Sequence, residues 1–338
     1  VNECSIALIG ATGAVGKVFL SILEERNFPA SSIRLCASER SYGKKIKVRG
    51  EEITIEEATP KLLSEVDVVF IAATGSISRQ MAPLAVEQGA IVVDKSSAFR
   101  MDPNVPLVVP EINPEDLDDH HGIIASPNCT TTPMVMALKP LIESNPAKRI
   151  IAASYQSVTG TGAAAGEELL AQSRQILDGQ TPSMEVYPHQ IAFNVLPHVE
   201  DFLENGYTTE EMKMQNETRK ILHAPDLKVS TTCVRVPIMI SHAEAVNVEF
   251  TNPISPGEVR EILSNSPGVR VVDDPQSNVY PMPVQSEGED DVFVGRIRTD
   301  ISLDNGIAMW LTCDNLRKGA ALNAIQIAEE MLNRGLVK

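Results

Sequence analysis

A glycine-rich turn near the start of the chain lies directly between an apolar strand and a helix. The strand is predicted over Ser5–Ile9, the turn reads Gly10-Ala11-Thr12-Gly13-Ala14-Val15-Gly16, and helical spacing of apolar residues follows over Val15–Glu25. Glycines here permit a tight turn and close backbone approach to a pyrophosphate, while the helix N-terminus offers free N–H groups. Thr12 stands where the common G-x-G-x-x-G fingerprint has its middle glycine. We expect a dinucleotide site at Gly10, Thr12, Gly13, Ala14 and Val15, with a purely structural turn as the alternative.

Strands and helices alternate through the first half of the chain. Further strands are expected at Ile33–Ala37, Val66–Ala72 and Ile91–Asp94, and a helix at Arg79–Gln88. Strands separated by helices of this length form βαβ units with right-handed crossovers, and therefore a parallel sheet. We predict an α/β chain that begins with a Rossmann-type, doubly wound domain over residues 1–127.

The second half has longer strand candidates, rich in β-branched residues and joined by Pro-rich connections. The expected strands are Ile150–Val158, Lys228–Pro237, Ala243–Phe250 and Ile307–Asp314, and the expected helices are Thr131–Glu143 and Ala163–Asp178. This pattern predicts an α+β domain with a mostly antiparallel sheet over residues 128–314. A final amphipathic helix is expected at Leu316–Leu332.

Composition narrows the class of protein. Hydrophobic residues make up 43% of the 338 positions, as in folded globular chains. The formal net charge of -16 would repel a phosphate backbone, so we expect no nucleic-acid binding. The apolar run Val68–Ala73 is far shorter than the roughly 20 residues of a membrane span, and the N-terminus shows no basic leader. We expect a cytoplasmic enzyme that acts on a small molecule.

The residues after the second strand indicate which dinucleotide binds. An NAD enzyme usually presents a carboxylate to the ribose hydroxyls there, whereas this chain has Ser38, Arg40 and Ser41. Small hydroxyls and a guanidinium suit a 2′-phosphate, so NADP is the expected cofactor; if Glu39 faces the ribose, NAD is preferred instead. A turn at Thr74-Gly75 after the third strand can hold the nicotinamide half, or can be an ordinary strand-end turn.

Cys129 differs from the other four cysteines, which lie in strand-like apolar stretches. The five cysteines show neither disulfide nor zinc spacing, so no metal site is expected. It lies in Asn128-Cys129-Thr130-Thr131, just before a predicted helix. A thiol at a helix N-terminus can ionise below its free pKa of about 8.5, which predicts a nucleophile. Thr130 and Thr131 can cap the helix. A buried cysteine in a capping region is the alternative.

A nucleophilic thiol needs an acid/base partner. His242 lies in a connection between two predicted strands, where functional side chains are often displayed. Arg235, in the apolar strand before it, needs an anionic partner, and a substrate carboxylate can bind it bidentately. A surface histidine remains the alternative for His242.

Several motifs, in this order, resemble aspartate-β-semialdehyde dehydrogenases over essentially the whole chain. They are Gly10-Ala11-Thr12-Gly13-Ala14-Val15-Gly16, Ser96-Ser97-Ala98-Phe99-Arg100, Pro127-Asn128-Cys129-Thr130, Ser154-Tyr155-Gln156-Ser157-Val158-Thr159-Gly160, Arg235 to His242 and Val294-Gly295-Arg296-Ile297-Arg298. Ordered motifs of this number are far more specific than any one of them.

The resemblance implies a role for each matching residue. Cys129 would be the acylating thiol, His242 the general acid/base, and Gln156 the residue that positions the intermediate. The implied substrate-binding residues are Arg100, Asn128, Glu210, Lys213 and Arg235, with Arg100 and Lys213 on phosphate, Arg235 on the α-carboxylate and Glu210 on the α-ammonium. Ser97 and Gly160 are assigned to the cofactor. A solvated i, i+3 ion pair is the simpler account of Glu210 and Lys213.

The implied reaction is NADPH-dependent reductive dephosphorylation of L-aspartyl 4-phosphate to L-aspartate 4-semialdehyde through a thioester, with release of inorganic phosphate. Its product feeds the synthesis of lysine, threonine, methionine and isoleucine. The resemblance also implies a homodimer joined through the second domain, and a final helix (residues 315–338) that completes the first domain.

Departures and rival functions remain open at this point. The family commonly has Asn at the position of Lys95, which either adds charge near the phosphate pocket or faces solvent, and Ser at the position of Thr130. N-acetyl-γ-glutamyl-phosphate reductase uses the same thioester chemistry without a free α-ammonium. Glyceraldehyde-3-phosphate dehydrogenase differs around its cysteine. A catalytically silent, dimeric scaffold is the alternative from another class of protein.

Overall fold

The computed structural model describes residues 3–337 and divides them into two compact units. One unit contains the described residues up to Asn128 together with those from Ala320 onward, and the other contains Cys129–Gly319. Of the helices in residues 3–337, none combines the length and the apolar character needed to cross a membrane.

The first unit is built on a seven-stranded sheet with the strand order β3-β4-β2-β1-β5-β6-β7. Its elements are β1 (Cys4–Ile9), α1 (Ala14–Glu25), β2 (Ala30–Cys36), β3 (Lys45–Val48), β4 (Glu51–Glu56), α2 (Pro60–Leu63), β5 (Val68–Ile71), α3 (Gly75–Glu87), β6 (Ile91–Asp94), β7 (Ile123–Ala125) and α9 (Leu322–Arg334). All neighbouring strands pair in parallel except β3 and β4, which form an antiparallel hairpin at one edge. The sheet is therefore of the predicted doubly wound Rossmann type, with an additional hairpin.

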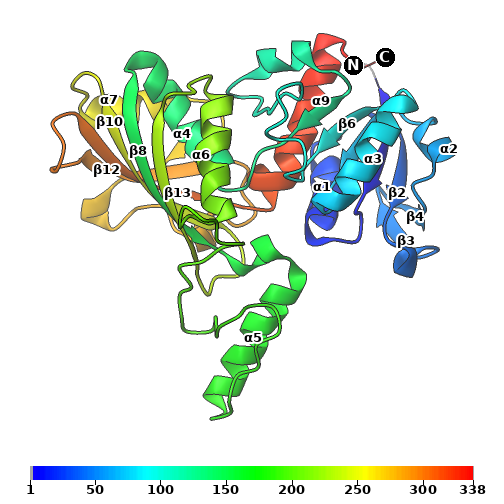
Figure 1. The fold of residues 1–338 in the computed structure, drawn as a ribbon, viewed down its shortest axis with the longest axis horizontal. Coiled ribbons are helices and arrows are strands. Elements are labelled where there is room, and N and C mark those ends of the chain that lie inside the picture. Colours follow the sequence, from blue (N-terminus) through cyan, green and yellow to red (C-terminus); the bar gives the residue numbers. More distant parts are fainter. Residues whose placement is uncertain (1–2, 338) are drawn as a thin grey trace. The chain divides into compact units, whose positions relative to one another are not determined.

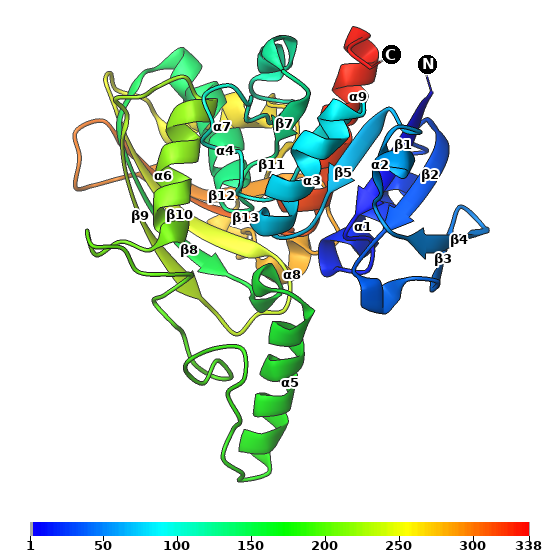
Figure 2. The same ribbon diagram turned by 45° about the vertical axis from the view of Figure 1, so that its right-hand side comes forward.

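Helices cover both faces of this sheet. Along strand β1, successive side chains lie alternately in one core and in the other. Ile6 and Leu8 pack with α1 and α9 in one apolar core, while Ala7 and Ile9 pack with α2 and α3 in another. Figure 2 shows α1 and α9 on one side of the strands and α3 on the other. Because successive strand residues point to opposite faces, a run of apolar residues is what a sheet buried on both sides requires.

The second unit contains a six-stranded sheet with the strand order β11-β12-β13-β10-β8-β9. Its elements are α4 (Thr131–Ser144), β8 (Ala147–Gln156), α5 (Ala163–Leu177), α6 (Thr209–Ile221), β9 (Lys228–Arg235), β10 (His242–Phe250), α7 (Pro256–Ser264), β11 (Val269–Val271), α8 (Pro283–Ser286), β12 (Val292–Thr299) and β13 (Gly306–Cys313). The pairs β8–β9 and β11–β12 are parallel and the other pairs are antiparallel. The predicted mostly antiparallel sheet is confirmed.

One face of the second sheet is packed against α4, α6 and α7. The other face carries half-exposed apolar side chains, among them Ala153, Tyr155 and Trp310, with Ile151 44% exposed. The rings of Tyr155 and Trp310 lie 5.3 Å apart between centroids. We call this second face the open face of the sheet.

Helix α5 extends away from the second sheet and is visible as a separate arm in Figure 1. Two buried polar side chains of this helix hold the loop that follows it. Glu168 accepts hydrogen bonds from the backbone N–H groups of residues 185–187, and Gln172 Oε1 accepts those of Ile191 and Ala192. The arm is thus fastened by backbone groups that would otherwise need water.

Three local predictions were wrong. The last helix was expected to be continuous over Leu316–Leu332, but Arg317–Ala321 forms a π-helix before α9 begins. Gly319 lies there with its Cα facing Cys129, where a Cβ would stand 3.0 Å from the cysteine Cβ. The turn expected around Thr74-Gly75 is instead the start of α3, with Thr74 as its N-cap. Among the described residues, Thr130 forms no side-chain hydrogen bond that caps α4, and the Thr131 hydroxyl has no partner.

Candidate active site

Four strand ends of the second unit meet at one edge of its sheet. The parallel strands β8 and β9 end at Gln156 and Arg235, which are partners in the register. Strand β10 runs antiparallel between β8 and β13, so its first residue, His242, lies at the same edge, opposite Cys313. Asn315 follows β13 by two residues. The sheet topology thus gathers polar side chains that are far apart in sequence.

Cys129 and His242 are brought into contact in this unit. Cys129 lies one residue before the N-cap of α4, and its Sγ is 3.3 Å from His242 Nε2. His242 is buried, whereas Cys129 is half-buried and within reach of solvent. A thiol beside an imidazole at a helix N-terminus has the arrangement that covalent catalysis by cysteine requires.

Gln156 takes part in a chain of polar contacts that reaches α6. Its Oε1 accepts from the Ser154 hydroxyl at 3.0 Å, and its Nε2 donates to Glu210 Oε1 at 2.9 Å. Glu210 Oε2 accepts from Lys213 Nζ at 3.2 Å, and Lys213 also pairs with Glu200. Glu210 is buried, so the solvated ion pair considered from the sequence is not what the structure shows.

Arg235 is buried beside these groups. Its Nη1 donates to the Ser157 carbonyl oxygen at 2.7 Å, while its Nε has no hydrogen-bond partner among the described residues. A buried guanidinium N–H without an acceptor is costly, which favours an anionic ligand as its partner. A Cβ added to Gly160 would stand only 3.1 Å from Arg235 Nη1 and 3.3 Å from His242 Nε2, so the absence of a side chain at Gly160 lets both groups lie close to this backbone.

The four remaining cysteines lie inside strands and are buried, as predicted. Burial raises the pKa of the Cys4 and Cys36 thiols to about 12, since a charged thiolate would lose its hydration there. Burial likewise raises the pKa of Cys233 and Cys313. Chemistry that needs a thiolate is therefore confined to Cys129.

The glycines of the turn in the first unit differ in how much space a side chain would have. Gly10 has φ +96, and a Cβ there would stand 2.3 Å from the Ala72 carbonyl oxygen; a Cβ on Gly16 would stand 2.3 Å from that of Gly10. Gly13 is the N-cap of α1 and forms no side-chain cap, and its nearest neighbour to a Cβ is 3.4 Å away. The Gly13 N–H donates to the Gly10 carbonyl oxygen at 3.0 Å, and the start of α1 beside it is an open helix N-terminus, as an anionic ligand requires.

The other residues predicted to bind the cofactor also follow parallel strands, at the edge where carboxyl ends meet. Ser38 and Arg40 are exposed after β2, and Ser41 is buried at the end of a short 3-10 turn. Thr74 and Gly75 follow β5, and Gly75 lies near Ala98, the neighbour of Ser97 after β6.

Arg100 and Lys95 hold the segment that leads to Cys129. Arg100 is buried, with Nε 2.9 Å from the Ser126 carbonyl oxygen and Nη2 2.7 Å from that of Lys95. Lys95 is partly buried, and its Nζ lies 3.4 Å from the Pro127 carbonyl oxygen. Asn128, the next residue, is buried.

Comparisons with known proteins identify the family. Residues 5–120 match the family model of the semialdehyde dehydrogenase NAD binding domain, and residues 138–318 match that of the semialdehyde dehydrogenase dimerisation domain. Aspartate-semialdehyde dehydrogenase of Aquifex aeolicus (strain VF5) is 50% identical over 98% of this chain and 99% of its own. The chain belongs to the aspartate-semialdehyde dehydrogenase family. It is an enzyme of the oxidoreductase class with an NAD(P)-binding domain.

Two solved structures of the family are similar along their whole length. Aspartate semialdehyde dehydrogenase II of Vibrio cholerae, solved in complex with ASA, has a TM-score of 0.96 and 42% identity, covering 98% of this chain and 99% of its own. The Candida albicans enzyme, solved with NADP, has a TM-score of 0.77 and 26% identity, covering 99% of this chain and 100% of its own.

Sequence reasoning missed Ser157, Ser241 and Asn315. The Ser157 N–H and hydroxyl lie 3.0 Å and 3.1 Å from His242 Nδ1, and Asn315 contacts both serines. Ser157 lies within the family motif Ser154–Gly160, so the sequence contained a signal for it. Asn315 could have been suspected only from its place just after an apolar strand.

Proposed function

We propose that this chain catalyses the NADPH-dependent reductive dephosphorylation of L-aspartyl 4-phosphate to L-aspartate 4-semialdehyde through a thioester on Cys129. The contact of 3.3 Å between Cys129 Sγ and His242 Nε2 carries the proposal. In this role the enzyme would act in the cytoplasm, in the biosynthesis of lysine, threonine, methionine and isoleucine.

The substrate would be held by the buried polar groups around this pair. Arg235, whose Nε has no hydrogen-bond partner among the described residues, would bind the α-carboxylate, and the buried carboxylate of Glu210 would accept from the α-ammonium. Gln156, fixed between Ser154 and Glu210, would position the reacting carbonyl. Asn128 would also contact the substrate.

The phosphate group requires cations, since the chain as a whole is acidic. Arg100 and Lys213 would bind it, as the family motif implies. The Lys213 side chain is 20% exposed, and its Nζ donates to Glu210, the proposed ligand of the α-ammonium.

In the proposed reaction, each residue of the site has one chemical role. The thiolate of Cys129 attacks the acyl carbon and releases inorganic phosphate, which leaves a thioester. NADPH, when bound, supplies the hydride that reduces this thioester. N–H groups at the start of α4 stabilise the tetrahedral oxygen, His242 exchanges a proton with the thiohemiacetal, and the aldehyde leaves as the thiolate re-forms.

NADP would bind to the first unit. The open N-terminus of α1 at Thr12–Ala14 suits the pyrophosphate. Packing inside the protein requires a glycine at Gly10 but not at Gly13, so the missing side chain at Gly13 leaves room for a ligand. Ser38, Arg40 and Ser41 would hold the 2′-phosphate, while Val15, Thr74, Gly75, Ser97 and Gly160 would line the rest of the site. The Candida albicans relative solved with NADP supports this choice over NAD.

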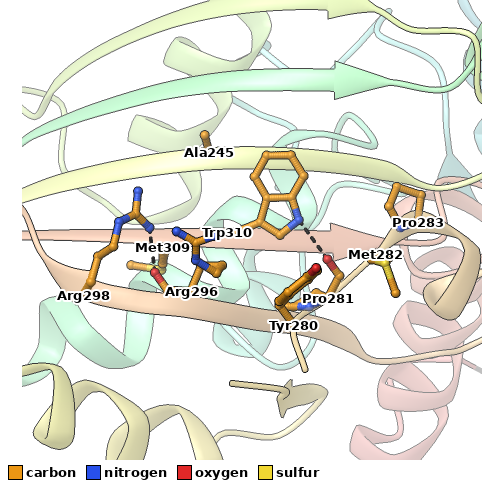
Figure 3. A pocket seen from close by; sticks show the side chains of 9 residues that line it. All are labelled: Ala245, Tyr280, Pro281, Met282, Pro283, Arg296, Arg298, Met309 and Trp310. Atoms are coloured by element: carbon orange, nitrogen blue, oxygen red, sulfur yellow. Dashed lines mark hydrogen bonds between the residues drawn. The ribbon is translucent and has the colours of Figure 1, made fainter. Parts of the chain in front are cut away.

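A homodimer joined through the second unit is also proposed, supported by the match to a dimerisation domain. The open face of the second sheet offers the apolar surface that such an interface needs. Figure 3 shows a pocket on this face, in which Trp310 Nε1 donates to the Pro281 carbonyl oxygen at 3.1 Å and Arg298 Nη1 donates to that of Arg296 at 2.7 Å.

The reaction can be tested in the reverse direction. Purified protein is given L-aspartate 4-semialdehyde, NADP and inorganic phosphate, with NAD in a parallel assay and Cys129→Ala as the matched variant. Reduction of NADP that requires phosphate, exceeds reduction of NAD and is lost in the variant is expected. Folded protein that reduces neither dinucleotide with this aldehyde would contradict the proposal.

A further inference from the structure

The Tyr187 hydroxyl contacts both ends of a turn that lies beside the proposed site. The turn is a short 3-10 helix over Val158–Thr161. The Tyr187 hydroxyl oxygen lies 3.3 Å from the Val158 carbonyl oxygen and 2.9 Å from Thr161 Oγ1. Since a carbonyl oxygen can only accept, the Tyr187 hydroxyl donates to Val158 and accepts from Thr161. One side chain thus joins the first and the last residue of the turn.

The guanidinium of Arg235 lies against the backbone of the same turn. Its Nη1 donates to the carbonyl oxygen of Ser157, the residue directly before the turn, at 2.7 Å. A Cβ on Gly160, inside the turn, would stand 3.1 Å from the same nitrogen. The turn therefore borders Arg235 Nη1 at two points, and a shift of the turn would move the guanidinium or release it.

Tyr187 is itself held in place from α5. Its N–H donates to Glu168 Oε1 at 3.3 Å, and its side chain packs against the apolar core that contains Leu169 and Ile191. Burial raises the pKa of the Tyr187 phenol above its ordinary value, and the positive charge of Arg235 acts against this rise, so the guanidinium lies near the phenol. The hydroxyl stays protonated at neutral pH, as its donation to a carbonyl oxygen requires.

We propose that Tyr187 is a positioning residue, which fixes the turn Val158–Thr161 and thereby keeps Arg235 aligned for the α-carboxylate of the substrate. This inference rests on the proposed role of Arg235 as the ligand of that carboxylate. Tyr187 acts through the turn and does not touch the substrate. The Thr159 hydroxyl donates to the Met239 carbonyl oxygen at 2.7 Å, so the turn remains attached to the protein when the Tyr187 hydroxyl is removed.

Binding of the α-carboxylate can be measured as protection of Cys129 from iodoacetamide. L-Aspartate and β-alanine are matched probes, because they differ only in the α-carboxylate. In the wild type, L-aspartate should give half protection at a concentration at least about 10-fold lower than β-alanine, since a guanidinium binds the extra carboxylate. In Tyr187→Phe, the L-aspartate concentration should rise about 3-fold or more, while the β-alanine concentration should change by less than about twofold.

Two further variants test whether the effect passes through the turn. Thr161→Val removes the other hydroxyl of the contact and should weaken L-aspartate in the same direction. The control is Tyr207→Phe, which removes a phenol hydroxyl that lies 2.9 Å from Ser230 Oγ on β9, and it should protect like the wild type. The proposal would be overturned by an equal shift for both ligands in Tyr187→Phe, by no shift for L-aspartate, or by the same shift in Tyr207→Phe.

The protection assay does not depend on turnover. A wild type that L-aspartate protects no better than β-alanine would overturn this inference, because Arg235 would then not bind the α-carboxylate. A protein inactive toward L-aspartate 4-semialdehyde but with the expected shifts would refute the proposed function and leave Tyr187 as a positioning residue for a carboxylate site. An active enzyme whose L-aspartate protection is unchanged in Tyr187→Phe would do the reverse.

Discussion

Cys129 Sγ lies 3.3 Å from His242 Nε2, although 113 positions separate the two residues in the chain. The contact exists because β10 runs antiparallel to β8, which brings its first residue to the edge where β8 and β9 end. Cys129 is half-buried, and His242 is buried behind it.

The first prediction concerns thiol reactivity. At pH 7 and low iodoacetamide, folded protein should be alkylated at Cys129 alone, because burial raises the pKa of the other four thiols and leaves them un-ionised. His242→Asn should slow this alkylation by about 10-fold or more, since a charge-assisted hydrogen bond of about 1.5–3 kcal/mol to the thiolate is lost. Peptide mass spectrometry after timed quenching measures both effects.

Alkylation of Cys129 at the same rate in His242→Asn would show that the imidazole does not stabilise the thiolate. Unfolded protein, in which all five thiols should react alike, is the control.

The second prediction concerns the space beside Gly160. In Gly160→Ala the new methyl group would stand 3.1 Å from Arg235 Nη1 and 3.3 Å from His242 Nε2, and would displace both side chains. We expect kcat/KM to fall by about 10-fold or more, because small misplacements of catalytic groups are costly, with little change in thermal stability. Gly257→Ala is the matched control, since its Cβ would meet only Ser255 Oγ, at 3.7 Å. Equal activity of the two variants would show that the Gly160 position is not critical.

The third prediction separates folding from cofactor binding in the glycine turn. Gly10→Ala should destabilise the first unit strongly, since it combines φ +96 with a contact of 2.3 Å to the Ala72 carbonyl oxygen. Gly13→Ala has an allowed conformation and a nearest contact of 3.4 Å, so it should fold normally but bind NADP at least about 10-fold more weakly, because its methyl group would hinder the pyrophosphate. Thermal unfolding and fluorescence titration distinguish these outcomes. Unchanged NADP affinity in Gly13→Ala would exclude this turn as the pyrophosphate site.

The fourth prediction concerns Glu244, which is fully buried on β10 two residues after His242. Within residues 3–337 neither carboxyl oxygen has a hydrogen-bond partner, and burial raises the pKa of this group well above its ordinary value. A raised folded-state pKa gives a stability contribution that is present below the ordinary pKa of about 4.3 and is lost as the pH rises through the folded value.

Replacing this carboxyl group should therefore raise the stability of the folded protein at high pH. Glu244→Gln and Glu244→Met should be more stable than wild type at pH 8, and the difference should shrink toward pH 5, as measured by urea unfolding. A difference that does not change with pH would show that Glu244 does not titrate with folding.

The sequence predicted those elements whose local pattern is strong. The apolar strand Ile91–Asp94 was predicted with its observed limits. The hairpin of β3 and β4 was missed although its residues alternate charged and apolar, because both strands are short, mostly exposed and rich in charged residues. The periodic spacing of apolar residues reflects which side chains are buried. Helices and strands that bury few side chains are therefore the hardest to predict from sequence.

The candidate site was predictable in its residue types and less so in its arrangement. Cys129, Arg235 and His242 could be selected from local context and family motifs. The supporting contacts of Ser157 and Asn315 depend on strand order and register, which no local pattern encodes. The same holds for Glu210, whose burial converts an ordinary i, i+3 pair into part of a polar network.

Intact-protein mass spectrometry of the proposed acyl-enzyme detects the thioester on Cys129 itself. Protein mixed with L-aspartate 4-semialdehyde and NADP, without phosphate, should form about one NADPH per reactive thiol and gain the mass of one aspartyl group on Cys129. Adding phosphate should remove the adduct and start turnover. Phosphate-dependent turnover with no such adduct, or turnover retained in Cys129→Ala, would contradict a thioester on Cys129.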